Sequence, residues 1–240
     1  MECESSVRLV RVVESLTSCH AENIRSMAHE FRSHRLHSHI RQEIVRYQGD
    51  LSDPTVFGIM GEGALLPYIL VRLLKPNFVI ETGVSAGFST AFILSAMERN
   101  GKGALVSIDF PIHAGGKNLP YPKFKSFIPT GLESGWLVPE SYLHRWNLFV
   151  GKSIELLPKV MSEIGEFDLF IHDSEHTESN MLGEFEMAWK YLRKGGVLLA
   201  DDVCMPHAGK SIAGDPFQKF ARSRRGVPYY HERMGCLVKA

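Results

Sequence analysis

The chain has 240 residues, 44% of them hydrophobic and 22% charged, and its 27 basic residues balance 27 acidic ones. This suits one sizeable α/β domain with additions, and zero net charge gives no electrostatic case for binding nucleic acid or an anionic membrane. Four scattered cysteines without a C-x-x-C pair, no signal-like N-terminus and no apolar run of roughly 20 residues predict a soluble, cytoplasmic protein.

Residues 1–55 are predicted to form a helical arm ahead of the main domain. Val7 and Val13 belong to one helically spaced apolar series, and Ile40 and Ile44 belong to another. Five histidines lie in the arm, and their mixed spacings favour packing or solvent exposure over metal binding. We expect the arm to serve as a lid or as the surface of a homodimer.

A glycine turn follows the first clear strand. A short apolar run ends at Glu81, Gly83 and Gly87 follow it, and a helical segment comes next. Strand, tight turn and helix together present backbone N–H groups and a positive helix end to a polar ligand. Three interpretations are open: a nucleotide-like cofactor site, a hydrolase G-x-S-x-G elbow with Ser85 as nucleophile, and a turn without a ligand.

Asp109 favours the cofactor interpretation. It ends the second predicted strand, where an acid can hold the hydroxyl groups of a ribose. The turn spells E-x-G-x-x-x-G and lacks the middle glycine of a nicotinamide-cofactor fingerprint. The hydrolase interpretation is weaker, because the candidate oxyanion loop at 113–116 follows the elbow instead of preceding it.

Residues 56–240 are predicted to form a doubly wound, mostly parallel, seven-stranded α/β sheet. The segment 110–139 is too long and too rich in Gly and Pro for a simple connection, so we expect a substrate-facing lid. The last two strands flank 233–235 and should form a C-terminal antiparallel hairpin. The remaining strands are predicted at 148–150, 169–172 and 197–201, and helices at 62–75, 90–99, 140–146, 153–164, 180–192 and 216–223.

Three aspartates follow neighbouring predicted strands. Asp173 follows one strand and Asp201 and Asp202 follow the next, 28 residues later (201 − 173). Parallel strands would bring all three to the same sheet edge, where clustered carboxylates repel each other or require a cation. Hard oxygen ligands favour Mg²⁺, Mn²⁺ or Ca²⁺. The alternative is that Asp201 or Asp202 only caps the following turn.

Over roughly residues 56–240, these features resemble class I S-adenosylmethionine-dependent methyltransferases. The segments 135–139 (Gly-Trp-Leu-Val-Pro), 172–176 (His-Asp-Ser-Glu-His) and 195–202 (Gly-Gly-Val-Leu-Leu-Ala-Asp-Asp) resemble the small-molecule O-methyltransferase group that includes macrocin O-methyltransferase. The resemblance implies a Rossmann-like fold. It also implies methyl transfer from S-adenosylmethionine to a hydroxyl of a sugar, natural-product or phenolic acceptor.

The resemblance also implies which residues hold the methyl donor. Ser153 would flank the adenine, Glu81 would lie near the methionine amino group or the turn's own amides, and Ser89 would reach the carboxylate unless it caps the helix. The complete implied set for S-adenosylmethionine is Glu81, Gly83, Ser85, Gly87, Ser89, Asp109, Ser153 and Asp173.

On the acceptor side the resemblance implies a divalent ion, Mg²⁺ or another, on Asp173, Asp201 and Asp202. The catechol type has an amide at the position of Asp202, so this chain would supply three anionic ligands, as in the sugar-modifying type. Asp173 and His176 are the implied catalytic residues, with His176 as the base where catechol-type enzymes use a lysine. The alternatives are a metal-independent methyltransferase of another acceptor atom, a hydrolase that uses Ser85, and a cofactor-binding module without catalysis.

Overall fold

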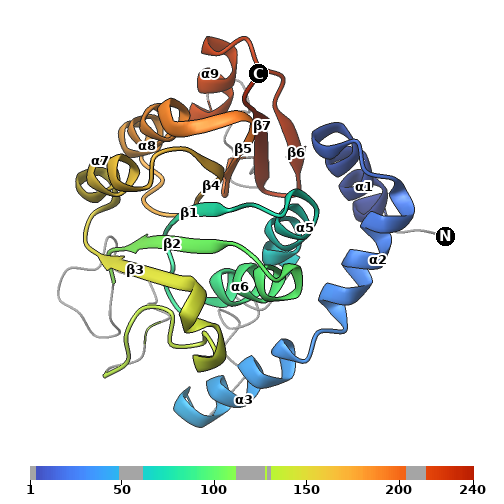
Figure 1. Ribbon diagram of the computed structural model, residues 1–240, viewed down its shortest axis with the longest axis vertical. Helices are drawn as coiled ribbons and strands as arrows, with labels where there is room; N and C mark the ends of the chain where they lie inside the picture. Colours follow the sequence, from blue (N-terminus) through green and yellow to red (C-terminus); the bar gives the residue numbers. More distant parts are fainter. Residues whose placement is uncertain (1–3, 49–61, 112–127, 129–130, 204–214) are drawn as a thin grey trace.

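The computed structural model describes residues 4–48, 62–111, 128, 131–203 and 215–240. Its strands are β1 (Phe78–Thr82), β2 (Ala104–Asp109), β3 (Trp146–Val150), β4 (Phe167–His172), β5 (Leu192–Ala200), β6 (Tyr229–His231) and β7 (Met234–Val238). They form a seven-stranded sheet in the order β3-β2-β1-β4-β5-β7-β6, shown in Figure 1. β1 to β5 are parallel, and β7 pairs antiparallel with both β5 and β6. The predicted mostly parallel sheet with a closing hairpin is therefore confirmed.

The helices alternate with the strands and also form the N-terminal arm. They are α1 (Glu4–Thr17), α2 (Ala21–Arg32), α3 (Leu36–Gln48), η1 (Glu62–Ala64), α5 (Leu65–Leu74), α6 (Phe88–Asn100), η2 (Glu140–Arg145), α7 (Ser153–Ile164), α8 (Glu178–Tyr191) and α9 (Pro216–Ser223). The predicted segment 140–146 is a 3-10 helix. The predicted domain boundary at 55/56 and most of the predicted lid at 110–139 lie outside the described residues.

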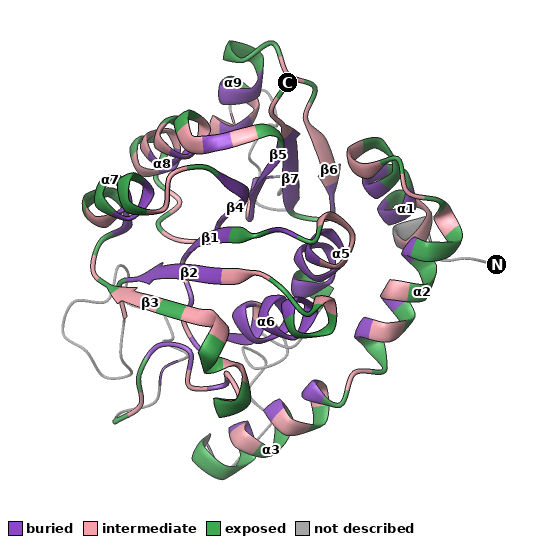
Figure 2. Ribbon diagram, in the orientation of Figure 1, coloured by how far each residue is buried: buried purple, intermediate pink, exposed green. Residues whose placement is uncertain are grey.

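Both faces of the sheet are buried, as expected for parallel strands between two helical layers. In β4, Leu169 and Ile171 join the core on the side of α5 and α6, whereas Phe170 joins the core under α7, α8 and α9. In β5, Leu199 joins the core on the side of α5 and α6, and Leu198 joins the core under α7, α8 and α9. Figure 2 shows this burial across the central strands. Because side chains of the strands fill the two cores, a polar site is expected among the residues that follow the strands at the edge of the sheet.

The arm thickens one of these layers. Figure 1 shows α1, α2 and α3 running along the outside of α5 and α6. α5 has the sequence LLPYILVRLL and is buried from Leu65 to Val71, because the sheet lies on one side of it and the arm on the other. Ile24 and Phe31 of α2 are buried in this contact. The arm thus shares the main core, and homodimer formation through it stays a prediction.

Two of the arm's histidines pack against α6. The rings of His34 and His37 lie 5.9 and 4.6 Å from the ring of Phe92, and the His37 Nε2 lies 2.9 Å from the carbonyl oxygen of Phe31. Desolvation lowers the pKa of both histidines. These two histidines therefore act as packing residues, which agrees with the simpler interpretation of the arm.

The C-terminal hairpin turns earlier than predicted. The turn consists of Glu232, with φ 51°, and Arg233, so Gly235 lies inside β7 instead of in the turn. A Cβ at Gly235 would lie 2.6 Å from the Phe217 ring and 2.7 Å from a methyl of Val203. The glycine is needed for close packing of α9 against β7, and sequence alone does not distinguish this from a turn glycine.

α9 begins at a side-chain cap that can be tested. Asp215 Oδ1 accepts hydrogen bonds from the backbone N–H groups of Phe217 (2.7 Å) and Gln218 (3.3 Å). Asp215→Ala should lower the free energy of unfolding by about 1 kcal/mol, because two N–H groups lose their acceptor. Asp215→Asn keeps an acceptor and is the matched control in urea unfolding. Equal stability of both variants and the wild type would contradict the cap.

Candidate active site

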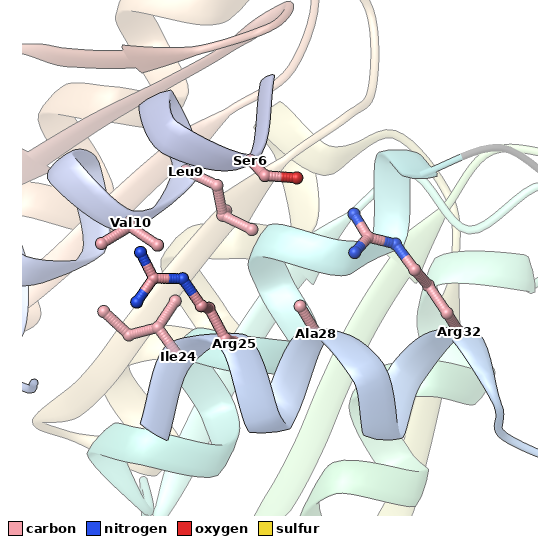
Figure 3. Close-up of a pocket in the computed structure, with 7 residues that line it drawn as sticks. All are labelled: Ser6, Leu9, Val10, Ile24, Arg25, Ala28 and Arg32. Carbon is pink, nitrogen blue, oxygen red and sulfur yellow. The ribbon is translucent and has the colours of Figure 1, made fainter. Parts of the chain in front are cut away.

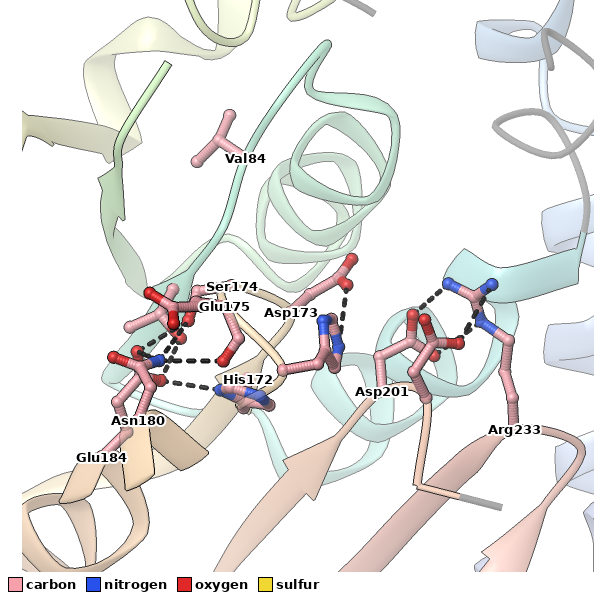
Figure 4. Close-up of polar contacts among 12 residues, drawn as sticks. Val84, His172, Asp173, Ser174, Glu175, Asn180, Glu184, Asp201 and Arg233 are labelled. Carbon is pink, nitrogen blue, oxygen red and sulfur yellow. Dashed lines mark hydrogen bonds and ion pairs between the residues drawn. The ribbon is translucent and has the colours of Figure 1, made fainter. Parts of the chain in front are cut away.

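The strand ends are joined side by side by backbone hydrogen bonds. The N–H of Asp173 donates to the carbonyl of Thr82 (2.8 Å), and the N–H of Asp201 donates to the carbonyl of His172 (2.9 Å). The ladder therefore continues one residue beyond β1, β4 and β5. Asp173 and Asp201 leave the sheet at the same carboxyl edge, as their spacing predicted (Figure 4).

The two glycines of the turn are packed by the chain itself. A Cβ on Gly83, which has φ +86°, would lie 1.9 Å from the carbonyl oxygen of Asp173. A Cβ on Gly87, with φ +89°, would lie 2.6 Å from the Cα of Gly135. The turn is therefore held between the segment after β4 and the segment around Gly135. Close approach of the chain's own backbone demands glycine here, whatever a ligand requires in addition.

Asp109 holds the same turn from the side of β2. Its Oδ1 accepts from the N–H groups of Val84 (2.9 Å) and Ser85 (3.3 Å), and its Oδ2 accepts from the Ser134 hydroxyl. Ser85 has φ 51°, and no hydrogen bond joins its hydroxyl to a histidine among the described residues. The described contacts therefore give the hydrolase interpretation no base.

Glu81 and the start of α6 leave polar groups unmatched at this turn. Glu81 is 1% exposed, and its Oε2 accepts from Thr90 (3.0 Å) and Ser107 (2.7 Å), while its Oε1 has no partner among the described residues. Desolvation raises the pKa of Glu81 to about 7, although these two hydrogen bonds oppose the shift. No side chain caps α6 at Gly87. A buried acid and an uncapped helix N-terminus suit a ligand with both an amino and a carboxylate group.

The raised pKa of Glu81 predicts a pH-dependent stability. Between its ordinary pKa of 4.5 and about 7 the folded chain keeps a proton that the unfolded chain loses. The stabilisation is therefore complete below pH 4.5 and is lost as the pH rises through about 7. Relative to that of Glu81→Gln, the free energy of unfolding of the wild type should fall by on the order of 3 kcal/mol between pH 4.5 and about 7. Urea unfolding of both proteins at several pH values tests this, and parallel curves would contradict it.

Glu184 is the buried centre of a second network. It is fully buried, and its Oε2 accepts from Thr82 Oγ1 at 2.6 Å and contacts His172 Nδ1 at 2.7 Å. Its Oε1 accepts from Ser174 (2.6 Å), Asn180 (3.0 Å) and the Ser153 hydroxyl. Desolvation would raise the pKa of Glu184, but the hydrogen bonds outweigh it and the pKa lies below its usual range. One carboxylate thus joins the ends of β1 and β4 to α7 and α8. Figure 4 shows Glu184 beside His172, Ser174 and Asn180.

Sequence reasoning missed Glu184, although a signal was present. Met181, Phe185 and Ala188 form the buried stripe of α8, and Glu184 occupies a position within it. A single acid in a buried helical stripe indicates a partner for buried polar groups. The predicted cofactor residue Ser153 directs its hydroxyl to this acid.

His176 lies beside Asp173 and His172. Its Nε2 is 3.9 Å from Asp173 Oδ1, and its ring packs edge-on to His172 with 5.2 Å between centroids. Desolvation and the neighbouring His172 lower the pKa of His176, so the imidazole is neutral near pH 7. Its Nε2 is buried and forms no hydrogen bond with any described residue. This nitrogen is therefore free to accept a proton.

The acids at this edge are paired with an arginine. Arg233 Nε lies 2.8 Å from Asp201 Oδ1, Nη2 contacts Oδ2, and Nη1 lies 3.3 Å from Asp202 Oδ1. Desolvation and repulsion from Asp201 and Asp202 raise the pKa of Asp173, and Arg233 opposes the shift.

The metal site on Asp173, Asp201 and Asp202 stays a prediction. Within the described ranges, no group of three or more His, Cys, Asp or Glu side chains is placed to hold an ion. Both oxygens of Asp201 already bind Arg233, which sequence reasoning treated only as a turn residue. The β5–β7 register offered a signal: Ala200 pairs with Gly235, so two positions further on Asp202 lies opposite Arg233.

A pocket on the arm lies apart from this edge. Figure 3 shows it between α1 and α2, where Leu9, Val10, Ile24 and Ala28 line it beside Arg25 and Arg32. Among the described residues, its lining contains no acid and no histidine. In the part of the chain that the structure describes, no helix is long and apolar enough to cross a membrane.

The parallel sheet, the glycine turn and the acidic edge define a Rossmann-like methyltransferase fold. Residues 80–203, or 124 of the 240 (203 − 80 + 1), match the family described as "Methyltransferase domain", and the chain belongs to this family. It is similar to the catechol O-methyltransferase of Niastella koreensis, with 24% identity over 139 residues that cover 56% of this chain and 53% of the relative. The chain thus spans about half the length of that relative.

Two solved structures share the fold. The S-adenosylhomocysteine-bound methyltransferase PaMTH1 of Podospora anserina has a TM-score of 0.55 and 14% identity, covering 92% of this chain and 95% of its own. The MycE methyltransferase of the mycinamycin pathway, in complex with Mg, S-adenosylhomocysteine and mycinamycin VI, has a TM-score of 0.50 and 14% identity, covering 84% and 54%. At these identities the likeness concerns the fold alone.

Proposed function

We propose that this protein transfers a methyl group from S-adenosylmethionine to a hydroxyl group of a small molecule. The observation that carries the proposal is the neutral His176, whose Nε2 has no hydrogen-bond partner among the described residues, on the segment that packs against the glycine turn. The contact of Gly83 with Asp173 brings the donor turn and this base to one edge. A methyl donor and a proton acceptor at one edge are the two parts that O-methylation requires.

The residues at the turn fit the methyl donor. Among the described residues, Glu81 Oε1 has no hydrogen-bond partner and no side chain caps α6, so the first suits the amino group of its methionine part and the second suits the carboxylate. When bound, S-adenosylmethionine supplies the methyl group, and its sulfur keeps the electron pair of the broken carbon–sulfur bond. Asp109, through its bonds to Val84 and Ser85, fixes the shape of the turn that would hold it.

His176 acts as the base in this proposal. Its Nε2 takes the proton of the acceptor hydroxyl as the oxygen forms its bond to the methyl carbon. Asp173, whose Oδ1 lies 3.9 Å away, stabilises the positive charge that the imidazole then carries. Glu184 binds His172 and thereby fixes the residue on which the His176 ring packs.

The acceptor class rests on the relatives. The name of the Niastella koreensis enzyme specifies a catechol, and MycE was solved with mycinamycin VI, so we propose a hydroxylated small molecule of the phenolic, sugar or natural-product type. MycE is also named with Mg. In this proposal His176 takes the proton, and Arg233 lies 2.8 Å from Asp201 and 3.3 Å from Asp202, two of the carboxylates that would hold an ion.

Two measurements test the proposal. Titration calorimetry with S-adenosylmethionine should show binding, and absence of binding at millimolar cofactor would reject it. Incubation with methyl-labelled cofactor and a panel of phenols, sugars and hydroxylated macrolides should then label an acceptor and release S-adenosylhomocysteine. Binding without transfer across the panel would favour the cofactor-binding module. Labelling by a fluorophosphonate that is lost in Ser85→Ala would favour the hydrolase.

A further inference from the structure

We infer that Arg233 supplies, from within the chain, the positive charge that a divalent cation would supply to Asp201 and Asp202, so that this edge binds no divalent ion. The inference concerns how the acceptor side is held together. It depends on the proposed function only because that proposal makes this edge the acceptor side.

The first support is the geometry of the ion pair. Asp201 is 1% exposed, and both of its oxygens face the guanidinium, with Nε 2.8 Å from Oδ1 and Nη2 on Oδ2. A third nitrogen, Nη1, lies 3.3 Å from Asp202 Oδ1. The planar fork of arginine matches a carboxylate in this two-bond arrangement. Each Asp201 oxygen thus already accepts a charged hydrogen bond, so an ion would have to share these oxygens with Arg233 or displace it.

The second support is the way the backbone places Arg233. β7 is antiparallel to β5, and Ala200 pairs with Gly235, so the hairpin turn comes opposite the residues that follow β5. The N–H of Val203 donates to the carbonyl of Arg233 at 3.0 Å, which ties the turn to the chain just beyond Asp202. The pairing of β7 with β5 therefore places the Arg233 guanidinium beside Asp201, as Figure 4 shows.

The third support is the charge balance. Asp173, Asp201 and Asp202 lie at one edge of the sheet, where their like charges repel each other. A divalent ion prefers six or more oxygen ligands and would have to displace the guanidinium to reach them. Arg233 already neutralises the most buried of the three acids. Its side chain is 48% exposed, so the guanidinium also faces the space outside the acids.

Manganese binding tests the inference without any need for activity. Electron paramagnetic resonance of free Mn²⁺ should show no bound ion in the full-length wild type at submillimolar Mn²⁺. Arg233→Gln removes the charge and should bind one Mn²⁺ at least about tenfold more tightly than the wild type does. Adding Asp201→Asn to Arg233→Gln should abolish the new site. Arg233→Lys keeps the charge and is the matched control, with no gain in Mn²⁺ affinity.

Two outcomes would overturn the inference. One is micromolar Mn²⁺ binding by the wild type that disappears in Asp201→Asn. The other is a folded Arg233→Gln variant, checked by circular dichroism, with no gain in affinity. If Arg233→Gln does not fold, the wild-type and Asp201→Asn titrations still decide. Failure of the proposed function is distinguishable, because it would show as absent S-adenosylmethionine binding whatever the Mn²⁺ result.

Discussion

Replacing His176 by glutamine should slow methyl transfer by about 10²- to 10⁴-fold, the usual contribution of a positioned base. The amide fills a similar space but cannot accept the hydroxyl proton that Nε2 would take. Affinity for S-adenosylmethionine should change little, because the predicted donor contacts lie at Glu81, the turn and the start of α6. Single-turnover rates, together with calorimetry of the cofactor, separate the two effects.

His144→Gln is the matched control for this prediction. His144 lies in η2, its side chain is 56% exposed, and its described partners are Glu98 and the carbonyl of Ser141. The control should keep the wild-type rate. Near-normal turnover in His176→Gln would show that another group takes the proton, and the alternative of a different acceptor atom would then gain support.

Replacing Glu184 by alanine should lower the free energy of unfolding by about 3–5 kcal/mol, as expected when a buried charged partner is removed from its network. Five side chains that contact its carboxylate would lose that partner: Thr82, Ser153, His172, Ser174 and Asn180. Urea unfolding followed by circular dichroism measures the loss. Glu184→Gln keeps the volume and one acceptor oxygen, so its loss should be smaller.

The control lies two residues further along the same helix. Glu186 pairs with Arg224 at the surface, and its side chain is 55% exposed, so Glu186→Ala should change stability by less than about 0.5 kcal/mol. A Glu184→Ala loss as small as that of the control would mean that water replaces the carboxylate. The network would then be a surface feature instead of a structural one.

Most of the fold could be predicted because its signals are local. Buried strands such as β2 are short apolar runs, and α7 and α9 were predicted at their observed bounds as helices that fill the gaps between predicted strands. The hairpin turn was misplaced because Gly235 serves the packing of Phe217, a contact between segments far apart in the sequence. Tertiary contacts of this kind leave no local trace.

The site was predictable where it depends on the order of parallel strands. Asp173 and Asp201 meet at one edge because each follows a neighbouring strand, and that much follows from spacing. The roles of Glu184 and Arg233 were not predicted, because each depends on a partner in another element of the fold. The metal site on the three acids stays a prediction, and that prediction did not include Arg233, whose guanidinium pairs with Asp201 and Asp202.

The contact between Gly83 and the carbonyl of Asp173 has a consequence for how this protein could diversify. At Gly83 the glycine turn and the segment that carries His176 touch backbone to backbone. A side chain at Gly83 would therefore displace one of these segments from the other. We expect a change of acceptor to involve segments outside this contact. The glycine turn and the His176 segment would then stay together while the pocket around them varied.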